Sequence, residues 1–137
     1  PGETDAQADV LADFLAAARL DAVGVFGYSD EEGTEGARLT PKVAEDVIAE
    51  RVDRISVLVD EVSAERASDR IGERLQVLVE AAAGDGSWTG RGAHQGPESD
   101  GSTTLVGAGV GARSGDLVWS RVTGADGVDL TAEAERE

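Results

Sequence analysis

Apolar residues recur every three or four positions in two long segments of the chain, a spacing typical of amphipathic helices. The first segment covers residues 4–20, and Thr4 or Asp5 suits the cap of a helix. The second covers residues 41–67 and begins at Pro41, which a first helical turn tolerates. The stripe of this second helix consists of Val43, Val47, Ile48, Val52, Ile55, Val59 and Val62. A single long stripe predicts a linker helix that packs on one surface only.

Between these two helices, residues 22–28 form a nearly continuous apolar run, AVGVFGY, of the length of a strand. A run without alternation predicts a strand that is buried on both faces, as in a parallel sheet. Such a strand needs neighbours on both sides, and one helix cannot replace them. We therefore expect residues 1–35 to be the last part of a larger α/β domain.

In the second half of the chain the apolar period changes to two, which predicts β-strands. Leu75, Val77 and Val79 share one side of such a strand, and Asp85-Gly86 is a signal for a hairpin turn. Short strands are expected within residues 75–79, 88–93, 103–106, 117–122 and 128–134. Five antiparallel strands with glycine corners indicate a small OB-like β-barrel, so the fold class is α+β.

The net charge is −16, from 28 acidic and 12 basic residues, and it argues against nucleic acid as the main partner. Nucleic-acid binding relies on Lys and Arg to replace counterions. A basic protein suits this charge better, although acidity that only maintains solubility explains it equally well. The chain has no cysteine and one histidine, His94, so we expect no metal site. No apolar run approaches the roughly 20 residues that span a bilayer, so we expect a cytoplasmic protein without a membrane role.

Three stretches resemble, in this order, the C-terminal part of the radical-SAM methylthiotransferase family, and within it the enzymes that modify ribosomal protein S twelve. The opening PGET resembles the end of the family's GFPGET segment, and residues 24–34 (GVFGYSDEEGT) resemble its GVFxYSxEEGT segment. Residues 90–101 (GRGAHQGPESDG) resemble the GRxxxxAPExDG loop of the appended TRAM domain, with Gly96 in place of alanine. The related tRNA enzymes carry a different sequence after YS.

The resemblance implies that residues 1–38 are the C-terminal helix and strand of a radical-SAM α/β barrel. Residues 39–68 would then be a linker helix, residues 69–135 the TRAM β-barrel, and residues 136–137 a tail. It also implies a full-length enzyme that uses S-adenosylmethionine and two four-iron four-sulfur clusters to methylthiolate an aspartate of S twelve. Because this chain has no cysteine, it cannot ligate a cluster and should be inactive alone.

The same resemblance implies contacts with S-adenosylmethionine near the start of the chain and at the end of the predicted strand. The candidate cofactor-binding residues are Glu3, Val25, Phe26, Tyr28 and Ser29. Simpler roles remain open, because Glu3 also suits the first turn of a helix and Val25 and Phe26 also suit a core. No catalytic residue is expected in this chain.

Charged and polar side chains on two loops are candidates for holding the protein substrate. The first loop offers Asp30, Glu31 and Glu32, which suit a basic protein and repel tRNA, unless they are only a solvated loop. The TRAM loop offers Arg91, His94, Gln95, Glu98 and Asp100.

Residues 69–137 hold 12 acidic and 6 basic residues, a balance that makes tRNA an unsuitable partner and favours a basic ribosomal protein. We expect a monomer. Two alternatives stay open: a fragment of a tRNA methylthiotransferase, and a free-standing TRAM or OB-type binding module without catalysis.

Overall fold

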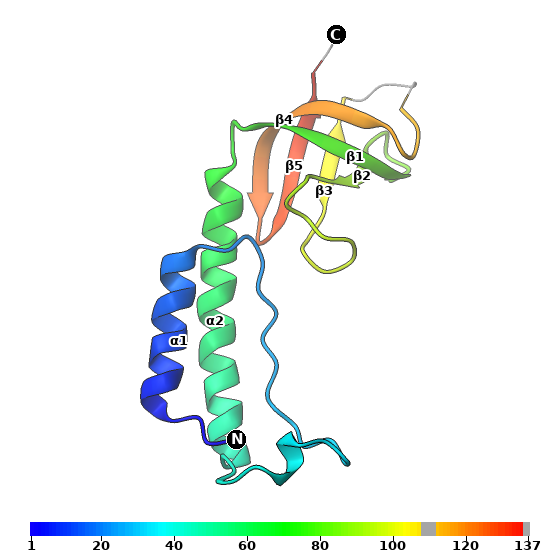
Figure 1. Ribbon diagram of the computed structural model, residues 1–137. Coiled ribbons are helices and arrows are strands. Elements are labelled where there is room, and N and C mark those ends of the chain that lie inside the picture. The colour runs from blue at the N-terminus through cyan, green and yellow to red at the C-terminus, as the bar shows by residue number, and fades with distance from the viewer. Residues whose placement is uncertain (108–111, 136–137) are drawn as a thin grey trace.

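The computed structural model describes residues 1–107 and 112–135. Figure 1 shows the helices α1 (Asp5–Ala18) and α2 (Glu45–Asp69) side by side, with a β-barrel at the C-terminal end of α2. An extended segment returns from the end of α1 along α2 and leads to the short 3₁₀ helix η1 (Gly36–Arg38). The predicted tail, residues 136–137, lies outside the described residues.

The first predicted helix is confirmed and begins with a well-formed cap. Thr4 accepts a hydrogen bond from the Gln7 backbone, and the Gln7 side chain accepts one from the Thr4 backbone, which completes a capping box. The helix ends at Ala18 because Arg19 adopts the left-handed conformation, with φ of 48°. Its buried side chains, Ala8 and Leu15, face α2 and the extended segment.

The predicted strand over residues 22–28 is wrong for this structure. The segment runs without regular secondary structure, and within the described residues its backbone forms no hydrogen bond to another backbone group. Val23 and Val25 pack against the cluster of Leu15, Ile55 and Val59, whereas the side chain of Phe26 is 91% exposed. The segment forms no strand because a strand requires neighbouring strands, and none lies beside it in the described chain.

The second predicted helix is confirmed, but it begins at Glu45 rather than at Pro41. Ala44 is the N-cap and has extended dihedral angles, so the residues after Pro41 lie outside the helix. Ile55 and Val59 are buried against α1 and the extended segment, and Ala67 reaches the core of the barrel. No helix of the described chain has the length and apolarity needed to cross a membrane.

Five strands form a closed barrel in the order β1-β2-β3-β5-β4. They are β1 (Arg74–Ala82), β2 (Trp88–Arg91), β3 (Thr103–Val106), β4 (Leu117–Asp126) and β5 (Asp129–Ala134). The prediction of a wholly antiparallel barrel is wrong, because β3 and β5 pair in parallel. Five strands cannot alternate in direction around a closed ring, so at least one neighbouring pair must be parallel.

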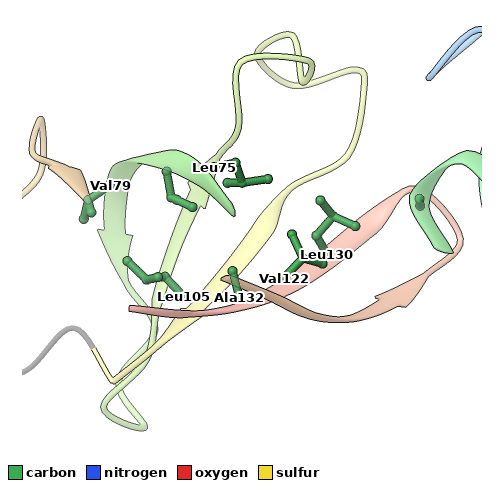
Figure 2. Packing of buried hydrophobic residues seen from close by; sticks show 8 residues of the cluster. Leu75, Val79, Leu105, Val122, Leu130 and Ala132 are labelled. Carbon is green, nitrogen blue, oxygen red and sulfur yellow. The ribbon is translucent and has the colours of Figure 1, made fainter. Parts of the chain in front are cut away.

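The core of the barrel is aliphatic and almost completely removed from water (Figure 2). Its most deeply buried members, each at most 2% exposed, are Val77, Val79, Leu105, Val122, Leu130 and Ala132. Burial of one of the Val or Leu side chains among them contributes about 1.5–3 kcal/mol to stability. The alternation of Leu75, Val77 and Val79 is therefore confirmed as the inward face of β1.

Candidate functional site

A cavity of about 810 Å³ lies where the N-terminal segment and α1, the extended segment and the first half of α2 meet. Its lining includes all of the residues that the sequence predicted as cofactor contacts: Glu3, Val25, Phe26, Tyr28 and Ser29. Residues 1–3 and 25–30 are far apart in sequence, so it is the packing of α1 against α2 that brings them together. Whether they contact a ligand stays a prediction.

Glu3 is held in place by an arginine of α2. Arg51 Nη1 donates to the Glu3 carboxylate at 2.8 Å and to the Glu3 carbonyl at 3.1 Å, while Nη2 donates to Asp5 Oδ1 at 2.6 Å. The hydrogen bond to Asp5 raises the pKa of Arg51, partial burial opposes this, and the hydrogen bond to Glu3 adds to the rise. Arg51 therefore stays charged and ties the start of the chain to the middle of α2.

A second pair of opposite charges, Lys42 and Asp30, also lines the cavity. Lys42 Nζ donates to Asp30 Oδ1 at 2.6 Å and to the Gly36 carbonyl at 3.0 Å, and it lies 5.8 Å from the centre of the Tyr28 ring. The hydrogen bond from Lys42 holds the pKa of Asp30 below its usual range. Burial, followed by the neighbouring Asp30 carboxylate, raises the pKa of Tyr28. Tyr28 is thus a neutral hydroxyl at physiological pH.

The predicted acidic loop is only partly engaged with this cavity. Asp30 lines it, whereas Glu31 and Glu32 are exposed beyond its rim. The Thr34 hydroxyl donates to the Glu31 backbone carbonyl at 2.8 Å, and both residues 31 and 32 are exposed to solvent. These two charges are free to meet a partner.

The residues around the cavity suit a small, partly polar organic ligand. Its volume lies within the range of small-molecule pockets, its walls include Val25, Ile48 and Val52, and carboxylates and a hydroxyl supply polar groups. The backbone groups of residues 25–29 are not used by a sheet, so they remain available for hydrogen bonds. S-adenosylmethionine, which combines an adenine with a charged amino acid, fits such a lining. Iron-sulfur clusters do not, because the sequence has no cysteine.

The part of the TRAM loop that follows β2, from residue 92 onward, is shaped by two of the predicted site residues. Gln95 is 4% exposed: its Oε1 accepts from Gly92 at 2.9 Å and from Thr103 at 2.7 Å, and its Nε2 donates to the Ser102 carbonyl at 2.9 Å. Asp100 accepts from the Gly96 backbone at 2.9 Å. The contacts of both side chains are internal to the loop and its adjoining strand.

Arg91 and Glu98 lie at a smaller polar cavity of about 310 Å³ on the barrel. Glu80, Ser102 and Asp129 complete its polar lining, and Arg91 pairs with Glu80 at 3.3 Å. Glu98 is exposed and has a positive φ of 66°. Of the five predicted TRAM-loop residues, these two are placed best for contact with a partner.

His94 belongs to a different cluster, at the junction between the barrel and the helices. Asp21 accepts from Arg70 at 2.8 Å and from Arg66 at 3.3 Å. Burial, followed by the charge of Arg70, lowers the pKa of His94, so the imidazole is neutral at physiological pH. The hydrogen bonds to Asp21 join the end of α1 to the end of α2, and a substrate contact of His94 stays a prediction.

Sequence reasoning missed Arg51 and Lys42 as parts of the cavity. A signal for Arg51 was present, because it lies three residues after Ile48 and four before Ile55, inside the apolar stripe of α2. A charged residue at such a position must find a partner when the stripe is buried. No comparable signal marks Lys42, because its neighbours are set by the loop of residues 29–44.

Comparisons with known proteins agree with this architecture. Residues 71–134 match the TRAM domain, which corresponds to the barrel. The ribosomal protein uS12 methylthiotransferase RimO of Kineococcus radiotolerans is 53% identical over 137 residues, covering 97% of this chain and 28% of that protein. RimO of Saccharopolyspora erythraea is 55% identical over 130 residues, covering 95% and 26%, and RimO of Salinispora tropica is 54% identical over 138 residues, covering 96% and 27%.

The chain therefore spans little more than a quarter of the length of these relatives. The matched region includes the cavity-forming segments as well as the barrel, since nearly all of the chain is covered. Taken with the TRAM match, this shows that the chain belongs to the RimO family of methylthiotransferases and corresponds to its C-terminal region.

Proposed function

We propose that this chain is the C-terminal part of a radical-SAM enzyme that methylthiolates an aspartate of a small-subunit ribosomal protein, S twelve. The observation that carries the proposal is the 50–55% identity to RimO proteins over almost the whole chain. In this proposal the barrel binds the protein substrate, and the 810 Å³ cavity forms one side of the cofactor site. A ribosomal substrate places the enzyme in the cytoplasm, and we expect a monomer.

Unsatisfied surfaces in the N-terminal region support a role for residues 1–38 as the edge of a catalytic barrel. Val10 and Phe14 of α1 are 68% and 60% exposed, and Phe26 is 91% exposed. Large apolar side chains exposed to this extent suit a surface that meets another part of the protein. In the longer enzyme, residues 22–28 would pair with a neighbouring strand and Phe26 would be buried.

The cavity residues have defined roles in this proposal. Backbone groups of Val25 and Phe26 would meet the adenine, Tyr28 and Ser29 would offer hydroxyls, and the Glu3 carboxylate would accept hydrogen bonds from the ligand's amino group. The chemistry that S-adenosylmethionine supplies is radical cleavage at an iron-sulfur cluster, whose thiolate ligands are not in this chain. This chain would bind and orient the cofactor without performing the cleavage.

Charge favours a basic protein over tRNA as the macromolecular substrate. The whole chain carries −16, and the exposed carboxylates of Glu31, Glu32 and Glu98 lie beside the two cavities. Opposite charges accelerate the encounter with a basic ribosomal protein, whereas a phosphate backbone is repelled.

Binding measurements on the full-length enzyme test this proposal. We expect the double substitution Glu31→Lys and Glu32→Lys to weaken binding of S twelve about tenfold, which corresponds to about 1.4 kcal/mol. The double substitution Asp60→Lys and Glu61→Lys changes the net charge equally on α2, outside both cavities, and should alter the affinity less than threefold. Equal losses of affinity in the two double variants, or tight tRNA binding at low salt, would contradict a protein substrate that binds at Glu31 and Glu32.

A free-standing binding module is the second candidate, because the barrel closes its own sheet and buries its own core. The mass of the natural protein distinguishes the two. An upstream extension that carries CxxxCxxC supports the enzyme, and a native chain of about this length supports the module.

A further inference from the structure

We infer that Arg51 of the linker helix is a positioning residue that holds the Glu3 carboxylate at the cavity for a cationic group of the ligand. The inference rests on the proposed function, because it needs a ligand that Glu3 contacts. It goes beyond the proposed function because it gives the linker helix α2 a part in forming the cofactor site.

The geometry of Arg51 is that of a clamp on the start of the chain. Its guanidinium binds both the backbone carbonyl and the side-chain carboxylate of Glu3, so it fixes the position of the residue and the direction of its side chain. Glu3 precedes α1 and follows Gly2, whose φ is +74°, so no regular element holds it. The Arg51 side chain is only 14% exposed, whereas that of Glu3 is 47% exposed and lines the cavity.

The charges of the cluster determine which ligand group it suits. Arg51 neutralises one of the two carboxylates that it binds, so Arg51, Glu3 and Asp5 together keep a net charge of −1. The hydrogen bond uses Oε1 of Glu3 and leaves the second carboxylate oxygen for a further donor. An ammonium or sulfonium group matches this arrangement, whereas a carboxylate or phosphate would be repelled.

Arg51 should strengthen ligand binding because it orders the Glu3 side chain before the ligand arrives. A free glutamate side chain loses rotamer freedom when a ligand immobilises it, and this entropic cost weakens binding. Because the clamp has already ordered Glu3, the ligand does not meet that cost. Loss of the clamp should therefore weaken binding even though Arg51 need not touch the ligand.

Arg54 provides a matched control in the same pair of helices. It lies one turn further along α2 and pairs with Asp9 of α1 at 2.6 Å, but neither residue lines the cavity. Arg54→Gln therefore removes an α1–α2 ion pair without altering the position of Glu3.

The experiment measures the dissociation constant of S-adenosylmethionine by equilibrium dialysis, using full-length enzyme with both clusters reconstituted. We expect the dissociation constant to increase about tenfold for Arg51→Gln and by less than twofold for Arg54→Gln. The increase for Arg51→Lys should lie between these values, because lysine keeps the charge but cannot bind several acceptors at once as the planar guanidinium does. Melting temperatures of all variants are measured in parallel, so that a general loss of stability would appear in both Gln variants.

A double-mutant cycle with Glu3→Gln separates the possible failures. If Arg51 acts through Glu3, Arg51→Gln should cause little further loss in the Glu3→Gln background. A full additional loss in that background would overturn the positioning role, as would unchanged affinity of Arg51→Gln beside a weakened Glu3→Gln. Unchanged affinity of Glu3→Gln itself would instead refute the proposed contact between Glu3 and the cofactor. If Arg51→Gln does not fold, the same double-mutant cycle can be measured with Arg51→Lys in its place.

Discussion

The β-barrel and the N-terminal region, formed by α1 and residues 22–30, satisfy their backbone and apolar groups in opposite ways. In the barrel every strand has two neighbours, and Leu105 and Ala132 have no exposed surface. In the N-terminal region the extended segment pairs with no strand, and Phe14 and Phe26 face solvent. The barrel closes its own sheet and core, whereas the N-terminal region presents apolar surfaces that the described residues leave exposed.

The largest expected difference between these regions comes from removing one apolar side chain in each. Leu105→Ala should cost about 2–5 kcal/mol, because it empties space in a closed core. Phe26→Ala should change the stability of this chain by less than about 0.5 kcal/mol, because the ring is exposed. Urea unfolding followed by fluorescence reports on the barrel, since Trp88 and Trp119 both lie in its strands. A cost for Phe26→Ala as large as that for Leu105→Ala would show that the two regions do not differ in this way.

A smaller effect is expected where two strands of the barrel come closest. A Cβ at Gly90 would overlap the Leu78 carbonyl and lie 2.8 Å from Val77 Cγ1, so Gly90→Ala should cost about 1–3 kcal/mol. At Gly124 the nearest atom to a new Cβ is Thr131 Cβ at 3.9 Å, so Gly124→Ala should be milder. The same urea titration compares them, and equal costs would contradict tight packing between β1 and β2.

The junction between the regions should give an effect of about 1 kcal/mol, near the upper limit for partly exposed ion pairs. Burial disfavours the charged form of Asp21, but the hydrogen bond from Arg70 and the charges of Arg70 and Arg66 outweigh it and lower the pKa. A carboxylate with a lowered pKa stabilises the folded chain fully above its usual value of 3.8, and this stability is lost as the pH falls through the folded value.

The unfolding curves of the parent and of Asp21→Asn should therefore differ at pH 7 and converge below pH 3.8. Thermal unfolding followed by helical circular dichroism measures this difference, because Asp21 joins α1 to α2. A gap that stays constant into strong acid would show that the charge of Asp21 is not what stabilises the junction.

The smallest effect is expected from Arg54→Gln, because Arg54 and its partner Asp9 are both well exposed, at 48% and 61%. Such surface pairs contribute roughly 0–1 kcal/mol and are screened by salt. Thermal unfolding at low and high salt should show a small difference that disappears in high salt. A large loss in high salt would mean that the contact between α1 and α2 depends on this pair more than its exposure suggests.

Pattern and chemistry led from the sequence to most elements of the fold. A cap residue at Thr4 marks the start of α1, the three- and four-residue spacing marks α2, and the alternation of Leu75, Val77 and Val79 marks β1. Each signal is local, because capping and amphipathic periodicity depend on residues a few positions apart. Glu3, Val25, Phe26, Tyr28 and Ser29, which line the cavity, were named through sequence resemblance, whereas Arg51, Lys42 and the contacts between these residues were not.

The elements that sequence reasoning misplaced are those that depend on distant neighbours. An apolar run at residues 22–28 has strand character, yet it forms no strand where no partner is present. The parallel pairing of β3 with β5 follows from closing a ring of five strands, which no single strand encodes. Burial of Gln95 is similar, since its hydrogen bonds join residues on both sides of a loop.

The sequence by itself thus determined the helices, the inward faces of the strands, the acidic charge and the family motifs, because each is written in short-range order or in composition. Only the tertiary structure decided that Glu3, Tyr28 and Arg51 share one cavity and that the barrel closes with one parallel pair. The reason is physical: a cavity and a closed sheet depend on contacts between residues separated by tens of positions, and those contacts exist only after the elements have packed.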